Sequence, residues 1–480
     1  MKILKEKWTK TPIAVKASTS YAICSVLQRC LSFITLPLFT RLLSTEQYGQ
    51  LTIYQSWSGI LSIFLTLNLA YGSFSTAMVK YEKDRDGYIS AVEGICLGLA
   101  GMFMAIYLPL RGLWNKLFEL PTLMMCLMVI ELLGSTAIQL WSGKKRFEFK
   151  YKSVVCVTLL MSIPSPIIAY YLVISTTEKG YARILGYSSV TVFVGGIFYV
   201  FNALKGKKIF YKEYWKYALG FNLPLLFYYL SQVVFNQSDR IMISHMVGKD
   251  KAAIYGVAYS LATILTFVLN AINNSYVPWY YGKIKEGKQE ENKKVSLIIA
   301  LIMSVLLSGV IWFAPEIISL LAGEEYVEAK FVVPPVAISI LLLFYAQLFI
   351  NVEFYYEEKK KLIWASLWAA LINLLLNWVF IRKFGFVSAA YTTLASYVIF
   401  VIANYLAMKK VLNEKGIKDD AYNYKMLIML FVVFCCVSII GVCIYNSFVI
   451  RVIIASVVMI GVLLKGKSIL CIIRSIKKRT

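Results

Sequence analysis

The sequence contains little charge and almost no histidine. Only 16% of its 480 residues are charged, whereas a soluble protein carries about 25%, and 59% are hydrophobic. The one histidine, His245, cannot build a histidine-based metal site. The nine cysteines show no CxxC spacing and lie almost all in apolar runs, which indicates helix packing. A GxxxxGK[ST] phosphate loop is also missing, so we expect no ATP hydrolysis and no cofactor.

The sequence does contain many long apolar runs. The mean hydropathy is +0.67, and about 14 runs are long enough to cross a bilayer. The segments between the runs are too short for a soluble catalytic domain, so an enzyme is not expected. The first run, 18–43, is too long and too polar for a signal peptide and should be retained. The sequence predicts an all-α polytopic membrane protein with about 14 transmembrane helices.

The positive charge is concentrated in the segments that follow every second run. The chain has 50 Lys and Arg against 26 Asp and Glu, a net charge of +24. GKKRFEFKYK (143–152), GKIKEGKQEENKK (282–294) and RSIKKRT (474–480) all fall on the cytoplasmic side if the N-terminus is inside. Anionic lipids beside this surface account for the charge without nucleic acid, and both termini are expected in the cytoplasm.

A weak internal repeat divides the chain. PLFTRLLS (37–44) resembles NQSDRIMIS (236–244), which places Arg41 opposite Arg240. Six runs in each copy give both halves the same orientation, so the repeats are parallel. The last two runs are nearly all apolar and are expected to face lipid. The predicted organisation is a six-helix bundle at 1–205, a second at 206–411 and an appended two-helix segment with a basic tail at 412–480.

Polar residues form stripes along the first two runs of each half. Those of the seventh run step by three, four or seven positions and share one helix face. Serine and threonine in such stripes often only hold helices together. Their recurrence at matching positions, with amides and charges, instead favours a water-filled cavity between the halves. The stripe residues that we expect to line it are Gln28, Gln55, Asn222, Tyr229, Gln232, Asn236, Asn270 and Asn273.

Charged residues embedded in the runs are costly. Arg29 lies near the middle of the first run, where a charge costs about 2.5–3.5 kcal/mol on insertion scales. It therefore needs a cavity or a partner, and the embedded Glu131 is one candidate partner. Three further charges lie near external helix ends, where the cost is lower: Arg41, Asp239 and Arg240. If they have no role in binding, the alternative interpretation is an interfacial ion pair that ends a helix. We expect His245 in a loop.

Two segments carry a family resemblance. SYAICSVLQRCLSFITLPLFTRLLSTEQYGQLTIYQ (20–55) and QSDRIMISHMVGKDKAAIYGVAYS (237–260) resemble the two repeat starts of bacterial polysaccharide-unit flippases of the Wzx type. These flippases belong to the multidrug/oligosaccharidyl-lipid/polysaccharide exporter superfamily. In span spacing and loop lengths the resemblance extends over 10–410.

The resemblance implies a function and partners. It implies a V-shaped pair of bundles in the bacterial cytoplasmic (inner) membrane that opens alternately to either side. The cargo would be undecaprenyl-pyrophosphate-linked oligosaccharide, carried to the outer leaflet for O-antigen, capsule or exopolysaccharide synthesis. Membrane lipids, a polysaccharide polymerase and a chain-length regulator are the implied partners.

Chemistry suggests roles for the embedded charges. We expect Arg29 to engage the pyrophosphate and Arg41 and Arg240 to draw it toward the external mouth. The polar stripes would bind sugar hydroxyls. Glu131 and Asp239 are candidate ion-coupling groups, because burial perturbs embedded carboxyls.

Three other functions remain open. A multidrug extruder shares the architecture but would be expected to have an acidic cavity, whereas the charge here is Arg29. A lipid II flippase often has two extra helices, as here, but a more strongly cationic cavity. A multispan polysaccharide polymerase would need a large loop with catalytic residues, which the sequence does not contain.

Overall fold

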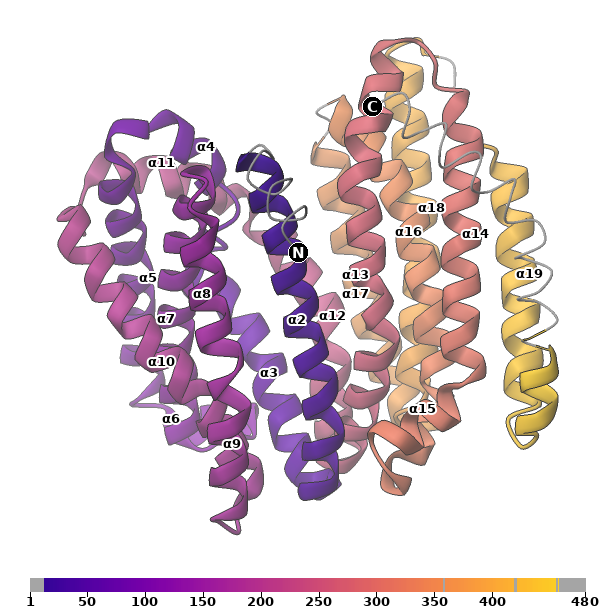
Figure 1. Cartoon of the computed structure of the whole chain (residues 1–480), viewed down its shortest axis with the longest axis horizontal. Helices are drawn as coiled ribbons and strands as arrows, with labels where there is room; N and C mark the ends of the chain where they lie inside the picture. Colours follow the sequence, from indigo (N-terminus) through magenta and orange to yellow (C-terminus); the bar gives the residue numbers. More distant parts are fainter. Residues whose placement is uncertain (1–12, 357–358, 418–420, 455, 457–480) are drawn as a thin grey trace, which may run out of the picture. The chain divides into compact units, whose positions relative to one another are not determined.

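The computed structural model describes residues 13–356, 359–417, 421–454 and 456. Every regular element among them is a helix, which confirms the all-α membrane fold (Figure 1). The chain forms two compact units, Met1–Ala253 and Ile254–Thr480. The bundles at 1–205 and 206–411 stay a prediction.

The first unit contains most of the short helices, six of the segments that could cross a membrane, and the long helix α3 (Thr45–Thr66). Its helices are α2 (Ile13–Leu42), α3 (Thr45–Thr66), α4 (Phe74–Lys80), α5 (Arg85–Tyr107), α6 (Arg111–Phe118), α7 (Thr122–Phe147), α8 (Tyr151–Ser162), α9 (Pro164–Ile174), α10 (Lys179–Gly206), α11 (Lys212–Asn222) and α12 (Leu226–Met246), with 3₁₀ turns at Glu82–Asp84 and Leu223–Leu225.

The second unit begins inside a long helix. Its helices are α13 (Lys249–Lys285), α14 (Glu291–Trp312), α15 (Ala314–Leu321), α16 (Val333–Tyr355), α17 (Lys359–Phe384), α18 (Ser388–Glu414) and α19 (Tyr424–Cys443), with a 3₁₀ segment at Glu324–Phe331.

Twelve segments among the described residues are long and apolar enough to cross a membrane. Each corresponds to one of the apolar runs of the sequence. The run near residue 58 forms α3, a helix of 22 residues that is long enough, at about 33 Å, but less apolar. The run near residue 457 lies almost entirely outside the described residues. The exact number of 14 spans stays a prediction.

Local sequence signals explain where helices begin and break. Ser44 and Gln47 form a capping box at the start of α3, with each side chain bound to the other residue's backbone N–H. Asp84 accepts a hydrogen bond from the N–H of Gly87 at the start of α5. Pro164 separates α8 from α9, and Pro224 lies in the 3₁₀ turn that separates α11 from α12. These two membrane-spanning segments are therefore broken helices.

Small residues allow the helices of the first unit to approach closely. Helices α5, α7 and α10 pack against one another (Figure 1). At the α7–α10 crossing Gly134 and Gly195 face each other, and a Cβ on Gly195 would overlap the Gly134 backbone. Gly186 of α10 lies similarly close to Ala169 of α9. Close backbone contact gives these helices their van der Waals packing, as is common in membranes.

In the second unit, α19 is fixed to α14. The indole N–H of Trp312 donates to the carbonyl of Val437 at 3.0 Å, and Trp312 lies directly over Gly441. Beyond α19, Arg451 is 1% exposed and makes a bidentate ion pair with Glu316 at 2.7 and 2.6 Å. The described part of the appended segment is thus attached to the second unit by specific polar contacts.

Candidate functional site

The sequence-predicted site residues divide between the two units. All but two belong to the first unit, whereas Asn270 and Asn273 lie on α13 in the second. Asn270 is exposed, and Asn273 donates a hydrogen bond to Gln347 of α16. A cavity shared between the halves stays a prediction.

Helix α2 presents its arginines at the surface of the first unit. Arg29 is exposed within the span Thr19–Leu42, and Arg41 is exposed at the end of the same helix. The neighbouring Gln28 donates from Nε2 to the Ser162 hydroxyl of α8 at 3.0 Å. Gln28 therefore has a helix-joining role, whereas Arg29 is accessible to a charged ligand.

The N-terminal part of the stripe along α11 and α12 is packed rather than open. Asn222, fully buried at the end of α11, donates to the Ser73 hydroxyl at 2.7 Å and to the Ala218 carbonyl at 2.9 Å. A Cβ on Gly72 would collide with the Asn222 amide oxygen and come within 3.0 Å of the Tyr229 hydroxyl. Asn222 and Tyr229 thus meet at Gly72, beside the break in the helix.

The C-terminal part of the stripe is more accessible. Gln232 and Asn236 are half-buried, and the Asn236 amide donates to the Gln232 carbonyl at 2.7 Å. Asp239 is 1% exposed, whereas the adjacent Arg240 is half-buried and donates to Gln237 at 2.7 Å. On α3, Gln55 is exposed. Gln232, Asn236 and Arg240 are therefore more accessible than the buried Asn222 and Asp239.

Glu131 joins three helices. Its Oε2 accepts hydrogen bonds from the Tyr54 hydroxyl of α3 at 2.7 Å and the Ser188 hydroxyl of α10 at 2.6 Å. These bonds satisfy one oxygen of a half-buried carboxyl within the span Thr122–Phe147. The pairing of Glu131 with Arg29 stays a prediction.

His245 is not in a loop, contrary to the sequence-based expectation. It lies in the last turn of α12, with Nδ1 3.2 Å from a carboxylate oxygen of Glu119, and the neighbouring Ser244 donates to the other oxygen. Glu119 follows α6 with a φ of 54°. The helix continues to Met246, and the chain turns only at Gly248, where φ is 147°.

The sequence interpretation missed several buried charges, among them Glu93 and Arg183. Glu93 of α5 is 1% exposed and accepts a hydrogen bond from the Asn202 amide of α10 at 2.8 Å. Arg183 of α10 is 7% exposed, with its guanidinium 4.3 Å from the Phe39 ring centre and 4.8 Å from that of Tyr48. Both lie inside apolar runs, so a search for charges within spans would have found them.

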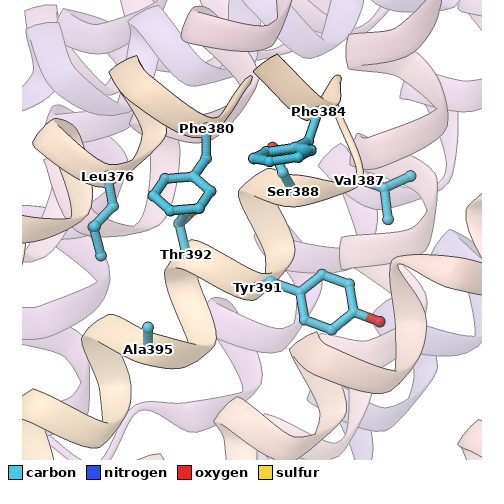
Figure 2. Close-up of a pocket in the computed structure, with 8 residues that line it drawn as sticks. All are labelled: Leu376, Phe380, Phe384, Val387, Ser388, Tyr391, Thr392 and Ala395. Carbon is cyan, nitrogen blue, oxygen red and sulfur yellow. The ribbon is translucent and has the colours of Figure 1, made fainter. Parts of the chain in front are cut away.

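A separate groove lies between α17 and α18 of the second unit (Figure 2). Its volume is about 420 Å³, and it contains none of the predicted site residues. The side chains that line it are mostly apolar or aromatic: Leu376, Phe380, Phe384, Val387, Ser388, Tyr391, Thr392 and Ala395. Its chemistry suits hydrocarbon rather than a polar headgroup.

Comparison with known proteins gives two family matches. A family described as "Polysaccharide biosynthesis protein" matches residues 14–281, and the family described as MatE matches residues 224–379. "Lsg locus putative protein 1" of Haemophilus influenzae is 24% identical over 364 residues, which is 74% of this chain and 88% of that protein. The "Putative O-antigen transporter" of Shigella flexneri is 24% identical over 282 residues, covering 55% of this chain and 58% of that protein.

Two solved structures share the fold. The lipid II flippase MurJ, in an inward closed conformation, matches with a TM-score of 0.60 and 16% identity over 90% of this chain and 99% of the flippase. An inward-facing MATE-family multidrug resistance transporter matches with a TM-score of 0.59 and 12% identity over 83% of this chain and 99% of the transporter. At these identities the likeness establishes the fold.

Proposed function

The chain belongs to the polysaccharide biosynthesis protein family, and from this premise we propose that it is a flippase for undecaprenyl-pyrophosphate-linked oligosaccharide units. The observation that carries the proposal is the family match over residues 14–281 of an integral membrane protein with a transporter fold. The named O-antigen transporter among its relatives supports O-antigen or a similar polysaccharide as the end product.

The exposed arginines suit the pyrophosphate. A pyrophosphate passing through a membrane needs cations, and a guanidinium binds phosphate oxygens in pairs. We assign this role to Arg29, the exposed charge near the middle of α2, and a guiding role to the exposed Arg41 and the half-buried Arg240 nearer the helix ends. Gln55, Gln232 and Asn236 would replace water at sugar hydroxyls.

The direction of transport follows from the charge of the cargo. Moving an anion out of a negative interior is favourable by about 2.3 kcal/mol per charge per 100 mV. The membrane potential alone therefore favours export. Coupling to an ion through Glu131 or Asp239 is the additional hypothesis from the sequence; transport that is indifferent to proton and sodium gradients would remove it.

The fold also fits two other cargoes, because a lipid II flippase and a multidrug transporter share it. The polysaccharide family match favours the oligosaccharide lipid over both. Increased drug sensitivity of a deletion strain that still makes its surface polysaccharide would favour the multidrug function. A polysaccharide polymerase and a chain-length regulator are the proposed functional partners.

The proposal is tested by replacing Arg29 in the native strain. Arg29→Ala should abolish surface polysaccharide, with lipid-linked single units accumulating on the cytoplasmic leaflet, at an unchanged level of membrane protein. Arg29→Lys keeps the charge but loses paired hydrogen bonds and should retain part of the activity. Arg382→Ala, at an exposed position on α17, is the matched control and should behave as wild type.

Two results would contradict this assignment. Normal polysaccharide in the Arg29→Ala strain removes the role of Arg29. Accumulation of single units in the outer leaflet of a deletion strain indicates that polymerisation, and not flipping, has been lost.

A further inference from the structure

Helix α5 carries a carboxyl group that the proposed transport path does not use. Glu93 lies about 12 Å along the helix from its start at Arg85, within the span Glu82–Tyr107. Its side chain is 1% exposed, and α7 and α10 pack against the helix that carries it. Figure 1 shows these helices within the first unit.

The hydrogen bonds of Glu93 suit a neutral carboxyl group. Oε1 accepts from the Asn202 amide at 2.8 Å, and the same amide also reaches the Ala137 carbonyl at 3.2 Å. Oε2 is buried and has no hydrogen-bond partner among the described residues. One neutral donor does not offset the cost of burying a carboxylate ion, which normally requires a cation or several donors.

The charged groups around Glu93 are engaged elsewhere. Lys144 of α7 binds Asp86 at 2.5 Å, and Lys205 of α10 lies 3.6 Å from the same carboxylate. The Tyr199 hydroxyl donates to the backbone carbonyl of Glu93, not to its side chain. The titratable or charged side chains on the helices packed around Glu93 include Asp86, Tyr88 and Cys96 of α5, Glu131 and Lys144 of α7, Tyr199 and Lys205 of α10, Tyr214 of α11, and Tyr54 of α3.

Two of these neighbours are already hydrogen-bonded to other carboxylates. Tyr54 donates to Glu131, and Tyr214 donates to Asp84 at 2.7 Å. Glu131 differs from Glu93 because two hydroxyls donate to its Oε2. Glu93 is therefore the carboxyl of this bundle whose packing is best matched to the protonated form.

We propose that Glu93 is a proton-binding site, occupied in this packed arrangement, whose deprotonation loosens α5 from α10 during the transport cycle. The proton on Oε2 passes to water when the helices separate, and a proton from water restores the neutral group when they close again. An ionised carboxylate draws water into the interface, which opposes closure. The proposal rests on the proposed function, because a transport cycle supplies the movement that the proton would drive.

Infrared spectroscopy of the purified full chain tests the protonation directly. A C=O stretching band of a protonated carboxylic acid should be present at neutral pH and disappear at higher pH. Glu93→Gln should remove that band, because the amide keeps the shape of the group but cannot ionise. Glu286→Gln, at a half-exposed carboxylate outside the spans, is the matched control and should retain it. A band unchanged by Glu93→Gln overturns the proposal.

Alkylation of Cys96 tests the coupled movement. Cys96 is 1% exposed, one turn from Glu93, whereas Cys156 is exposed and corrects for the general effect of pH on thiol reactivity. The ratio of Cys96 to Cys156 labelling should rise at least about tenfold over the pH range in which the infrared band disappears. Both changes should follow the deprotonation of one group. In Glu93→Gln the ratio should stay low at every pH.

A second variant separates proton binding from simple packing. Asn202→Ala keeps the Glu93 carboxyl but removes the hydrogen bond that favours its ionised form. The pH midpoint of the infrared band and of Cys96 labelling should therefore move to higher pH by about one unit. If the contact between Asn202 and Glu93 had only a packing role, Asn202→Ala would change Cys96 labelling equally at every pH. Wild-type pH dependence in Glu93→Gln overturns the coupling. Neither readout needs the cargo, so a failure of the flippase assignment is recognised separately by the Arg29 experiment.

Discussion

At the scale of single residues, three lysines surround the carboxylate of Glu148 in the basic segment 143–152. Glu148, just after α7, accepts from Lys145 at 3.1 Å and Lys150 at 3.0 Å, and Lys144 lies 3.5 Å away. Burial alone would raise the pKa of this carboxyl. The hydrogen bonds from Lys150 and Lys145 and the charge of Lys144 outweigh burial and lower its pKa to about 2.

This lowered pKa predicts a pH-dependent stability contribution. Because the folded pKa is below the ordinary value of 4.5, the contribution is complete above about pH 4.5 and is lost as the pH falls toward 2. Glu148→Gln should therefore reduce the free energy of unfolding by about 1 kcal/mol at pH 7 and by much less near pH 2. Thermal unfolding in detergent at the two pH values measures this.

The control for this prediction is an exposed carboxylate. Glu290 pairs with Lys293 at 3.1 Å but its side chain is 78% exposed, so Glu290→Gln should leave the melting temperature unchanged. An equal loss for Glu148→Gln at both pH values would show that packing, and not the charge, makes the contribution.

At the scale of elements, the sequence predicted where the helices lie better than it predicted which residues they contact. Apolar length located the spans, whereas the breaks after Ile163 and within Leu223–Leu225 were seen only in the structure. Periodicity gave one stripe from Asn222 to Asp239, but the 3₁₀ turn changes the direction of the chain after Asn222. Asn222 consequently packs against Ser73. Such a partner, 149 positions away, is decided by tertiary packing.

The close approach of α7 and α10 at Gly195 predicts that a larger side chain there destabilises the protein, and the adjacent Gly196 provides the control. Gly195→Val should destabilise the protein by about 2 kcal/mol or more, because its side chain would overlap the Gly134 backbone. Gly196→Val, with nothing within 4 Å of its Cβ, should have a small effect. Thermal unfolding in detergent compares the two. Equal losses would mean that helix propensity, and not close packing, limits substitution here.

At the scale of the whole molecule, the distribution of basic residues predicts one orientation in the membrane. The segment that contains Lys288 should face the cytoplasm, and the segment that contains Glu324 should face outward. Single cysteines at these two positions, in a variant without the native cysteines, test this in intact cells. A membrane-impermeant maleimide should label the cysteine at 324 and spare that at 288. The reverse pattern would contradict the predicted orientation.

The sequence by itself determined the class of the molecule. A low fraction of charged residues and long apolar runs permit only a helical membrane protein, because a backbone in lipid must satisfy its hydrogen bonds within each helix. The polar stripes and embedded charges also predict where a ligand path should be sought. These are properties of composition and periodicity, which a single chain displays without reference to contacts.

Only the tertiary structure decided what each polar residue contacts. It placed Gln28 and Asn222 in helix packing, left Arg29 exposed, and gave His245 a carboxylate partner in Glu119. It also revealed Glu93, whose side chain accepts a hydrogen bond from a residue 109 positions away. Long-range packing sets whether a buried group is satisfied, and helical periodicity alone contains no information about the facing helix.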